Sequence, residues 1–165
     1  MTVEMDIQPY NAATDLPGCM AIWRAASEDG HPFLTTRDLD ADERKVRDVY
    51  MPMAQTRVAV VDGTVAGFIA LLDDFIGGLF VDPARFRKGI GRRLIEDAIR
   101  RKGRLSLEVY ERNERALAFY RSLGFRATGR RPTDDQDRPL ALVSLVLDDS
   151  GSALTSAADN GRPAP

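Results

Sequence analysis

Hydrophobic and polar positions follow two periods along the chain, one typical of strands and the other of helices. Alternation every second residue, or a short apolar run, predicts seven strands, at residues 3–8, 57–61, 65–72, 75–81, 105–109, 125–130 and 139–147. Apolar residues spaced three and four apart predict four helices, at residues 14–27, 40–54, 91–102 and 114–123. The order β-α-α-β-β-β-α-β-α-β-β indicates an α/β protein built on a mixed sheet with helices on both faces.

Turn residues separate these elements. Asp62-Gly63 is typical of a tight hairpin turn, and the Gly77-Gly78 pair inside a strand run predicts a bulge. Thr14 or Asp15 is the expected cap of the first helix. Residues 28–34 are expected to form a loop that exposes two apolar side chains.

Length and composition favour a single globular domain. A chain of 165 residues, 44% hydrophobic and 29% charged, is long enough for one buried core, and we expect the domain to cover residues 1–147. From residue 148 the chain is mainly Ser, Ala, Gly, Asp and Pro, which predicts a disordered tail over 148–165.

Charge and residue counts exclude several classes of function. A net charge of −2 argues against a nucleic-acid binder, and the absence of an apolar run of 18 residues argues against a membrane protein. The single cysteine, Cys19, rules out an internal disulfide and favours the cytoplasm; we expect a buried, inert thiol. His31 is the only histidine, so a metal site and a Ser-His-Asp hydrolase are both disfavoured.

The candidate chemistry begins in a basic glycine loop. The apolar run Leu79–Val81 leads into residues 85–93, which contain five basic residues and no acidic one. Within them, Gly89-Ile90-Gly91 closes a loop, and a helical pattern begins directly after it. Strand, glycine loop and helix N-terminus together form a site for phosphate groups, because free N–H groups and the helix dipole favour anions. No Walker string exists, and Leu94 stands where a dinucleotide fingerprint needs a third glycine. An ordinary tight turn is the alternative for this fragment taken alone.

A second motif lies downstream, at residues 105–125. It consists of Leu105-x-Leu107-x-Val109, Asn113-x-x-Ala116, Phe119-Tyr120 and Gly124-Phe125. Together with the glycine loop and the order of elements, it resembles the GCN5-related N-acetyltransferase (GNAT) superfamily, in particular its small stand-alone bacterial members. The resemblance extends from residue 3 to about 147, with one departure: Phe86 stands where the family loop usually carries Arg or Gln.

The resemblance implies acetyl-CoA as co-substrate and an amine as acceptor, with dimers common in the family. Backbone N–H groups of the glycine loop would hold the pyrophosphate, and the strand before it would pair with the pantetheine arm. A backbone N–H at the Gly77–Leu79 bulge would polarise the thioester oxygen. The implied cofactor-binding residues are Leu79, Phe80, Val81, Arg87, Lys88, Gly89, Ile90, Gly91, Arg92, Asn113, Ala116, Phe119 and Tyr120.

Tyr120 is the general acid that the resemblance implies for protonating the leaving thiolate. Packing of Tyr120 on the apolar face of its helix is the alternative. Glu108 alternates with its apolar neighbours and is a candidate base acting through a water, or else a solvated carboxylate. Since the amine needs only modest help, a mechanism without a dedicated base stays open.

Three functions remain open at this stage. Trp23, His31 and Phe33 are candidates to line the acceptor pocket, although a lone loop histidine is more often a surface residue. Asp134, Asp135 and Asp137 in the turn at 133–139 would suit a cationic acceptor. We expect N-acetylation of a small-molecule amine. The alternatives are acetylation of a protein, at a lysine or an N-terminus, and a non-catalytic acyl-CoA-binding module.

Overall fold

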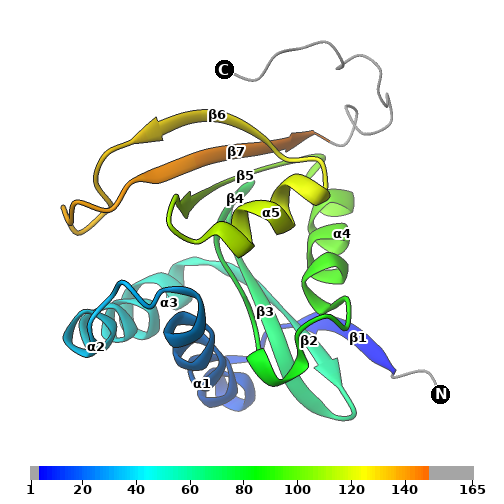
Figure 1. Ribbon diagram of the computed structural model, residues 1–165. Coiled ribbons are helices and arrows are strands. Elements are labelled where there is room, and N and C mark those ends of the chain that lie inside the picture. The colour runs from blue at the N-terminus through cyan, green and yellow to red at the C-terminus, as the bar shows by residue number, and fades with distance from the viewer. Residues whose placement is uncertain (1–3, 149–165) are drawn as a thin grey trace. The chain divides into compact units, whose positions relative to one another are not determined.

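The computed structural model describes residues 4–148 and divides into two compact units, Met1–Asp97 and Ala98–Pro165 (Figure 1). The boundary falls inside the helix α4 (Ile90–Lys102). Elements follow the predicted order, with short helical turns added, so the α/β class is confirmed. The tail expected over 148–165 lies outside the described residues except for Asp148, which ends the last strand. None of the described helices is long and apolar enough to cross a membrane.

Four antiparallel strands form the sheet of the first unit. They lie in the order β1 (Met5–Pro9), β2 (Gln55–Val61), β3 (Thr64–Leu72) and β4 (Phe75–Val81). Asp62 and Gly63 both have positive φ, 53° and 79°, as a two-residue hairpin turn requires. The predicted hairpin between β2 and β3 is therefore confirmed.

The predicted bulge in β4 is also confirmed. Ala70 pairs with Gly78, and the next residue, Leu71, pairs with Ile76. Gly77 is thus left without a partner on β3. Because Gly77 and Gly78 have no side chains, the strand carries none at these two positions.

Helix α1 (Ala12–Gly30) packs on β3 and β4 and differs from its prediction at both ends. The cap is Asn11, whose Oδ1 accepts the N–H of Ala13 at 3.0 Å, and neither Thr14 nor Asp15. Asp15 instead accepts the N–H of Asn11 at 2.8 Å, which favours the earlier start. At its other end α1 continues to Gly30 rather than residue 27, so the loop that follows is shorter than predicted. Leu34 in this loop is buried, contrary to the expected exposure.

The second predicted helix is split into three pieces: α2 (Thr36–Lys45), a π-helical turn (Val46–Tyr50) and α3 (Met51–Met53). It begins earlier than predicted because Thr35 and Asp38 form a reciprocal capping box. Arg24 of α1 bonds Asp40 at 2.8 Å and Glu43 at 2.9 Å, which ties α1 to α2.

Helix α4 is fastened to the strands of the first unit by two arginines. Arg57 of β2 donates to both carboxylate oxygens of Asp97, at 3.1 and 3.4 Å, and this ion pair is largely buried. Arg93 donates to the carbonyl of Met5 on β1 at 3.4 Å. Together these contacts fix α4 over β1 and β2.

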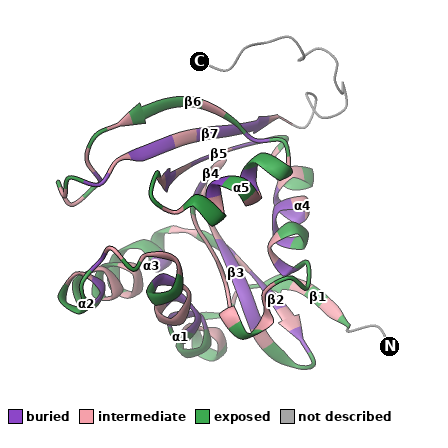
Figure 2. Cartoon of the chain, viewed as in Figure 1, coloured by how far each residue is buried: buried purple, intermediate pink, exposed green. Residues whose placement is uncertain are grey.

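The second unit contains β5 (Arg104–Tyr110), α5 (Glu114–Ser122), β6 (Arg126–Arg131) and β7 (Leu142–Asp148). β7 lies between β5 and β6 and is antiparallel to both. β7 is almost continuously buried, whereas β6 is mostly exposed (Figure 2). β7 begins at Leu142 rather than at 139, because Leu140 N–H bonds the carbonyl of Arg138 at 2.7 Å and keeps that segment in the turn.

We expect Asp97→Ala to lower the free energy of unfolding by about 3 kcal/mol, because Arg57 would stay buried without its partner. Asp48→Ala is the matched control: its carboxylate pairs with Arg47 on the surface, and we expect a loss of about 0.5 kcal/mol or less. Urea unfolding of both variants measures the difference. Equal losses would show that the Arg57–Asp97 pair contributes no more than a surface contact.

Candidate active site

The basic loop of the first unit is shaped by a short 3-10 turn, Pro83–Arg85. Asp82 caps it, accepting the N–H of Ala84 at 3.0 Å, and the N–H of Phe86 bonds the carbonyl of Pro83 at 3.3 Å. The N–H of Phe86 is therefore used within the turn. Phe86, the one departure from the family loop, supplies the end of this turn rather than a cation.

The next residues turn the backbone toward the helix. Arg87 has φ +67° and Gly89 has φ +81°, the left-handed region that is unusual for a residue with a side chain. Nothing lies within 4 Å of the position that a Cβ on Gly89 would take. Gly89 is needed for its backbone conformation, and the space beside it is open.

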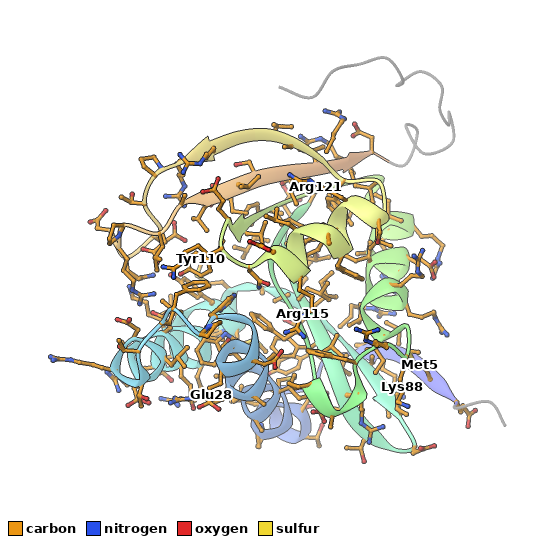
Figure 3. The ribbon with its side chains drawn as sticks, viewed as in Figure 1. Met5, Glu28, Lys88, Tyr110, Arg115 and Arg121 are labelled. Carbon is orange, nitrogen blue, oxygen red and sulfur yellow. The ribbon has the colours of Figure 1, made fainter. Side chains whose placement is uncertain are left out.

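The start of α4 offers free donors. The first helical bond runs from the N–H of Arg93 to the carbonyl of Gly89 at 3.0 Å, so the N–H groups of Ile90, Gly91 and Arg92 precede the helical ladder. Arg87, Lys88 and Arg92 are exposed and form no ion pair with any residue in the described range 4–148. Figure 3 labels Lys88 on this loop. Unpaired cations beside free N–H groups are the groups that a diphosphate site would require.

Gly67 of β3 sets the position of this helix start. A Cβ on Gly67 would lie 2.9 Å from the carbonyl oxygen of Phe80 and 3.1 Å from Cγ2 of Ile90. Ile90 is the first residue of α4 and is only 2% exposed. The first turn of α4 therefore rests on a backbone without a side chain. Sequence reasoning missed Gly67, although a glycine inside a strand run is itself a sign of close approach.

Leu79, Phe80 and Val81 of β4, the predicted partners of the pantetheine arm, are all half-buried. The Phe80 ring packs against Phe68 of β3, with centroids 5.4 Å apart, and against Trp23 of α1 at 6.4 Å. Trp23 is only 5% exposed, so its main contacts lie in the core of the first unit.

His31 and Phe33 come together after α1, with ring centroids 5.5 Å apart. Burial lowers the pKa of His31 to about 4 from an ordinary value of 6.5, and the charge of Asp42 offsets part of that shift. The imidazole is therefore neutral at pH 7.

In the second unit, Asn113 caps α5 as predicted. Its Oδ1 accepts the N–H of Ala116 at 3.2 Å. Tyr120 is buried and packs edge-on against Phe119 at 5.2 Å and Phe125 at 5.3 Å. Burial raises the pKa of the Tyr120 phenol, because the phenolate would lose its hydration. Tyr120 is held protonated and in a fixed orientation.

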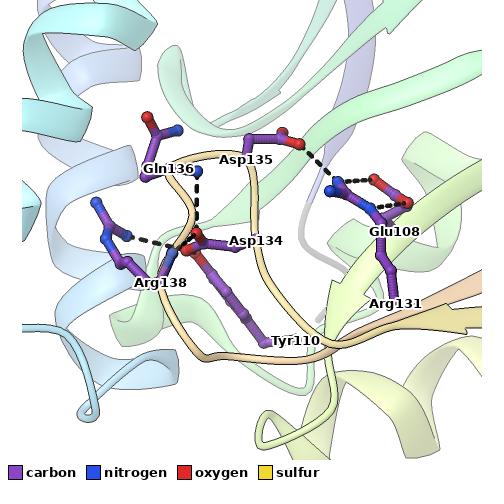
Figure 4. A network of polar contacts seen from close by, with 7 residues as sticks. All are labelled: Glu108, Tyr110, Arg131, Asp134, Asp135, Gln136 and Arg138. Atoms are coloured by element: carbon purple, nitrogen blue, oxygen red, sulfur yellow. Dashed lines mark hydrogen bonds and ion pairs between the residues drawn. The ribbon is translucent and has the colours of Figure 1, made fainter.

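Glu108 lies in a polar network at the β5–β7 end of the second unit (Figure 4). Its two oxygens accept from Nε and an Nη of Arg131 at 3.0 and 2.8 Å, and Arg131 also bonds Asp135 at 2.6 Å. Glu108 is thus a paired carboxylate rather than a freely solvated one. A carboxylate has about four lone-pair sites, so two remain for a water or an amine.

Asp134 does not supply the expected charge for a cationic acceptor. It is 3% exposed, and its carboxylate accepts from the hydroxyl of Tyr110 at 2.7 Å and from Arg138 at 3.3 Å. It also accepts the N–H groups of Gln136 and Arg138, each at 2.9 Å. The turn is organised around Asp134, and its neighbour Asp135 is paired with Arg131. Two of the three predicted acceptor carboxylates are therefore occupied within their own unit.

We expect Gly67→Ala to weaken coenzyme A binding about tenfold, equivalent to about 1.4 kcal/mol, because the methyl group would displace Ile90 and the first turn of α4. Gly18→Ala is the control, since its Cβ would meet only Val65 at 3.8 Å. Calorimetric titration with coenzyme A measures both affinities. Unchanged affinity in Gly67→Ala would contradict the role given to this contact.

Comparison with known proteins identifies the family. A family model described as an acetyltransferase (GNAT) domain matches residues 52–127. The chain is 36% identical over 128 residues to peptidyl-lysine N-acetyltransferase YjaB of Salmonella typhimurium, covering 77% of this chain and 88% of that protein. It is 32% identical over 132 residues to peptidyl-lysine N-acetyltransferase YiaC of Escherichia coli, covering 79% and 90%.

Solved structures share the fold. The solution structure of apo YjaB from Escherichia coli matches with a TM-score of 0.80 and 32% identity, covering 87% of this chain and 97% of that one. A structure of YncA from Salmonella typhimurium with acetyl-CoA matches with a TM-score of 0.63 and 22% identity, over 94% and 98%. The predicted fold, N-acetyltransfer and acetyl-CoA as co-substrate are confirmed. The protein is a member of the GNAT acetyltransferase family.

Proposed function

We propose that this enzyme acetylates lysine side chains of polypeptides. The observation that carries the proposal is the similarity, at 36% and 32% identity over most of the chain, to two enzymes named peptidyl-lysine N-acetyltransferases. The sequence favoured a small-molecule amine. The similarity to these two enzymes moves our preference from a small amine to a lysine side chain.

The proposed donor site lies in the first unit. N–H groups of Lys88, Gly89, Gly91 and Arg92 bind the pyrophosphate, and the exposed cations Arg87, Lys88 and Arg92 neutralise its charge. Gly89 and Gly91 keep this backbone accessible to the phosphate oxygens. Exposed cations add affinity that weakens as salt is raised.

The pantetheine arm pairs with the backbone of Leu79, Phe80 and Val81, as an added strand would. The Gly77–Leu79 bulge supplies the N–H that polarises the thioester oxygen. In the second unit, Asn113, Ala116 and Phe119 are the proposed further contacts of the cofactor.

The chemical step is direct transfer. The neutral amine nitrogen of the acceptor attacks the thioester carbon, the C–S bond breaks, and the sulfur leaves as a thiolate that takes a proton from Tyr120. The acceptor lysine must first lose its ammonium proton. Glu108 is the proposed base, accepting that proton through a water at a lone pair not used by Arg131. The nitrogen loses a second proton as the amide forms, and that proton restores the Tyr120 phenol.

The acceptor surface and the cellular setting complete the proposal. His31 and Phe33 are proposed to contact the acceptor, and Trp23 supports the aromatic cluster behind β4. A neutral His31 avoids repelling a cationic lysine. The cytoplasm and a homodimer remain predictions from the sequence and the family resemblance.

The acceptor class is tested by incubating the protein with acetyl-CoA and two matched sets of amines. One set contains lysine peptides and an unfolded protein; the other contains polyamines, amino-acid derivatives and amine drugs. We expect mass spectrometry to detect acetyl-lysine in the polypeptide set, with thiol release at least tenfold faster than for small amines. Faster turnover of a small amine would overturn the lysine assignment.

We expect Tyr120→Phe to lower kcat by about 100-fold or more, with an unchanged affinity for acetyl-CoA, because only proton donation is lost. Since burial raises the phenol pKa, the wild-type phenol stays protonated in alkaline solution, and kcat should not fall as pH passes 10. Tyr110→Phe in the same unit is the control and should keep the wild-type pH profile of kcat. Full activity of Tyr120→Phe would remove Tyr120 as the acid.

A further inference from the structure

We propose that the ring of Phe80 limits the length of the acyl group that this enzyme accepts. The inference rests on the proposed function in one respect: the thioester lies at the β4 bulge. It assigns to Phe80 a role in donor selectivity, in addition to the role of its backbone in pairing with the pantetheine arm.

The Phe80 ring occupies the space that a side chain at position 78 would need. Gly78 and Phe80 are two residues apart on β4 and so face the same side of the sheet. A Cβ on Gly78 would lie 2.5 Å from Cε2 of Phe80 and 3.3 Å from Cδ2. The ring therefore lies directly over the Gly78 backbone, next to the bulge where Gly77 has no partner on β3.

The ring is held from behind. Phe68 of β3 and Trp23 of α1 contact it at 5.4 and 6.4 Å between centroids, and these two residues are only 1% and 5% exposed. Phe80 itself is half-buried, so the residue is not fully enclosed by its neighbours. A rigid aromatic ring with a packed back is a fixed steric limit rather than an adaptable one.

This arrangement discriminates by length. An acyl group whose carbonyl bonds an N–H at the bulge would have its alkyl end beside the glycine backbone, against the Phe80 ring. An acetyl methyl fits there, whereas each further methylene must displace the Phe80 ring, and a hydrophobic pocket typically discriminates about 10-fold or more per methylene. Removing the ring should admit propionyl and butyryl groups.

The experiment compares acetyl-CoA with butyryl-CoA in wild type, Phe80→Leu and Phe80→Ala. We expect the ratio of kcat/KM for butyryl-CoA to that for acetyl-CoA to rise about tenfold in Phe80→Leu and further in Phe80→Ala. Gly18→Ala on α1 is the control, because its Cβ would make only an ordinary contact, 3.8 Å from Cβ of Val65, and the residue lies outside the proposed donor site. Its ratio should equal that of wild type. An unchanged ratio in both Phe80 variants, or an equal rise in Gly18→Ala, would overturn the proposal.

Thermal shifts with CoA, acetyl-CoA and butyryl-CoA separate this inference from the proposed function. The shift of the melting temperature with CoA alone shows that each variant is folded and that its glycine loop binds the cofactor. A shift with butyryl-CoA larger than that with CoA should appear only in the Phe80 variants. If wild type acetylates no polypeptide, the lysine assignment fails while this comparison still decides the role of Phe80. Equal butyryl-CoA shifts in wild type and both Phe80 variants would refute it.

Discussion

The close approach of three backbone segments in the first unit is the constraint on which the donor site depends. Gly67 of β3, the carbonyl of Phe80 and the side chain of Ile90 meet at distances that leave no room for a Cβ. Ile90 is at once a buried core residue and the first residue of α4. Burial of its side chain therefore fixes the helix N-terminus, whose free N–H groups need a set position to bind a diphosphate. The pairs Arg57–Asp97 and Arg93–Met5 hold the rest of the same helix.

Charge is used differently in the two units. In the second unit the charges are paired in two sets: Arg131 bonds Glu108 and Asp135, and Arg138 bonds Asp134 within the turn before β7. Around the start of α4, Arg87, Lys88 and Arg92 have no carboxylate partner among residues 4–148, whereas Arg85 pairs with Asp82 at 3.9 Å, and the whole chain carries a net charge of −2. A cluster of unpaired like charges destabilises the free protein and is relieved by an anion. The locally unbalanced charge is thus a better guide to the proposed anion site than the net charge of the chain.

The sequence predicted the order of elements, the hairpin at Asp62-Gly63, the bulge at Gly77 and the cap at Asn113, because each depends on neighbours in the chain. The predictions failed where several residues compete for one role, or where a contact joins residues that are distant in the chain. Asn11 outcompetes Thr14 and Asp15 as the cap of α1, since Asp15 folds back to bond the N–H of Asn11. Local spacing predicts neither the contact of Gly67 with Ile90 nor the pairing of Glu108 with Arg131. In each pair the two residues are 23 positions apart and meet only through the tertiary fold. The family motif supplied the roles that periodicity could not.

Burial of Tyr120 bears on how its proposed proton transfer works. A phenol whose pKa is raised stays protonated, but it is also a weaker acid than a thiol in water, which has a pKa of about 8.5. Transfer to a hydrated thiolate would therefore be unfavourable. The same loss of hydration that raises the phenol pKa also raises that of a thiol formed beside it, since both groups become anions on losing a proton. Only the difference between the two pKa values enters the proton-transfer step. In the proposed mechanism Tyr120 would therefore act on a thiolate released in the same dry surroundings, so the proposed role requires that water be excluded there.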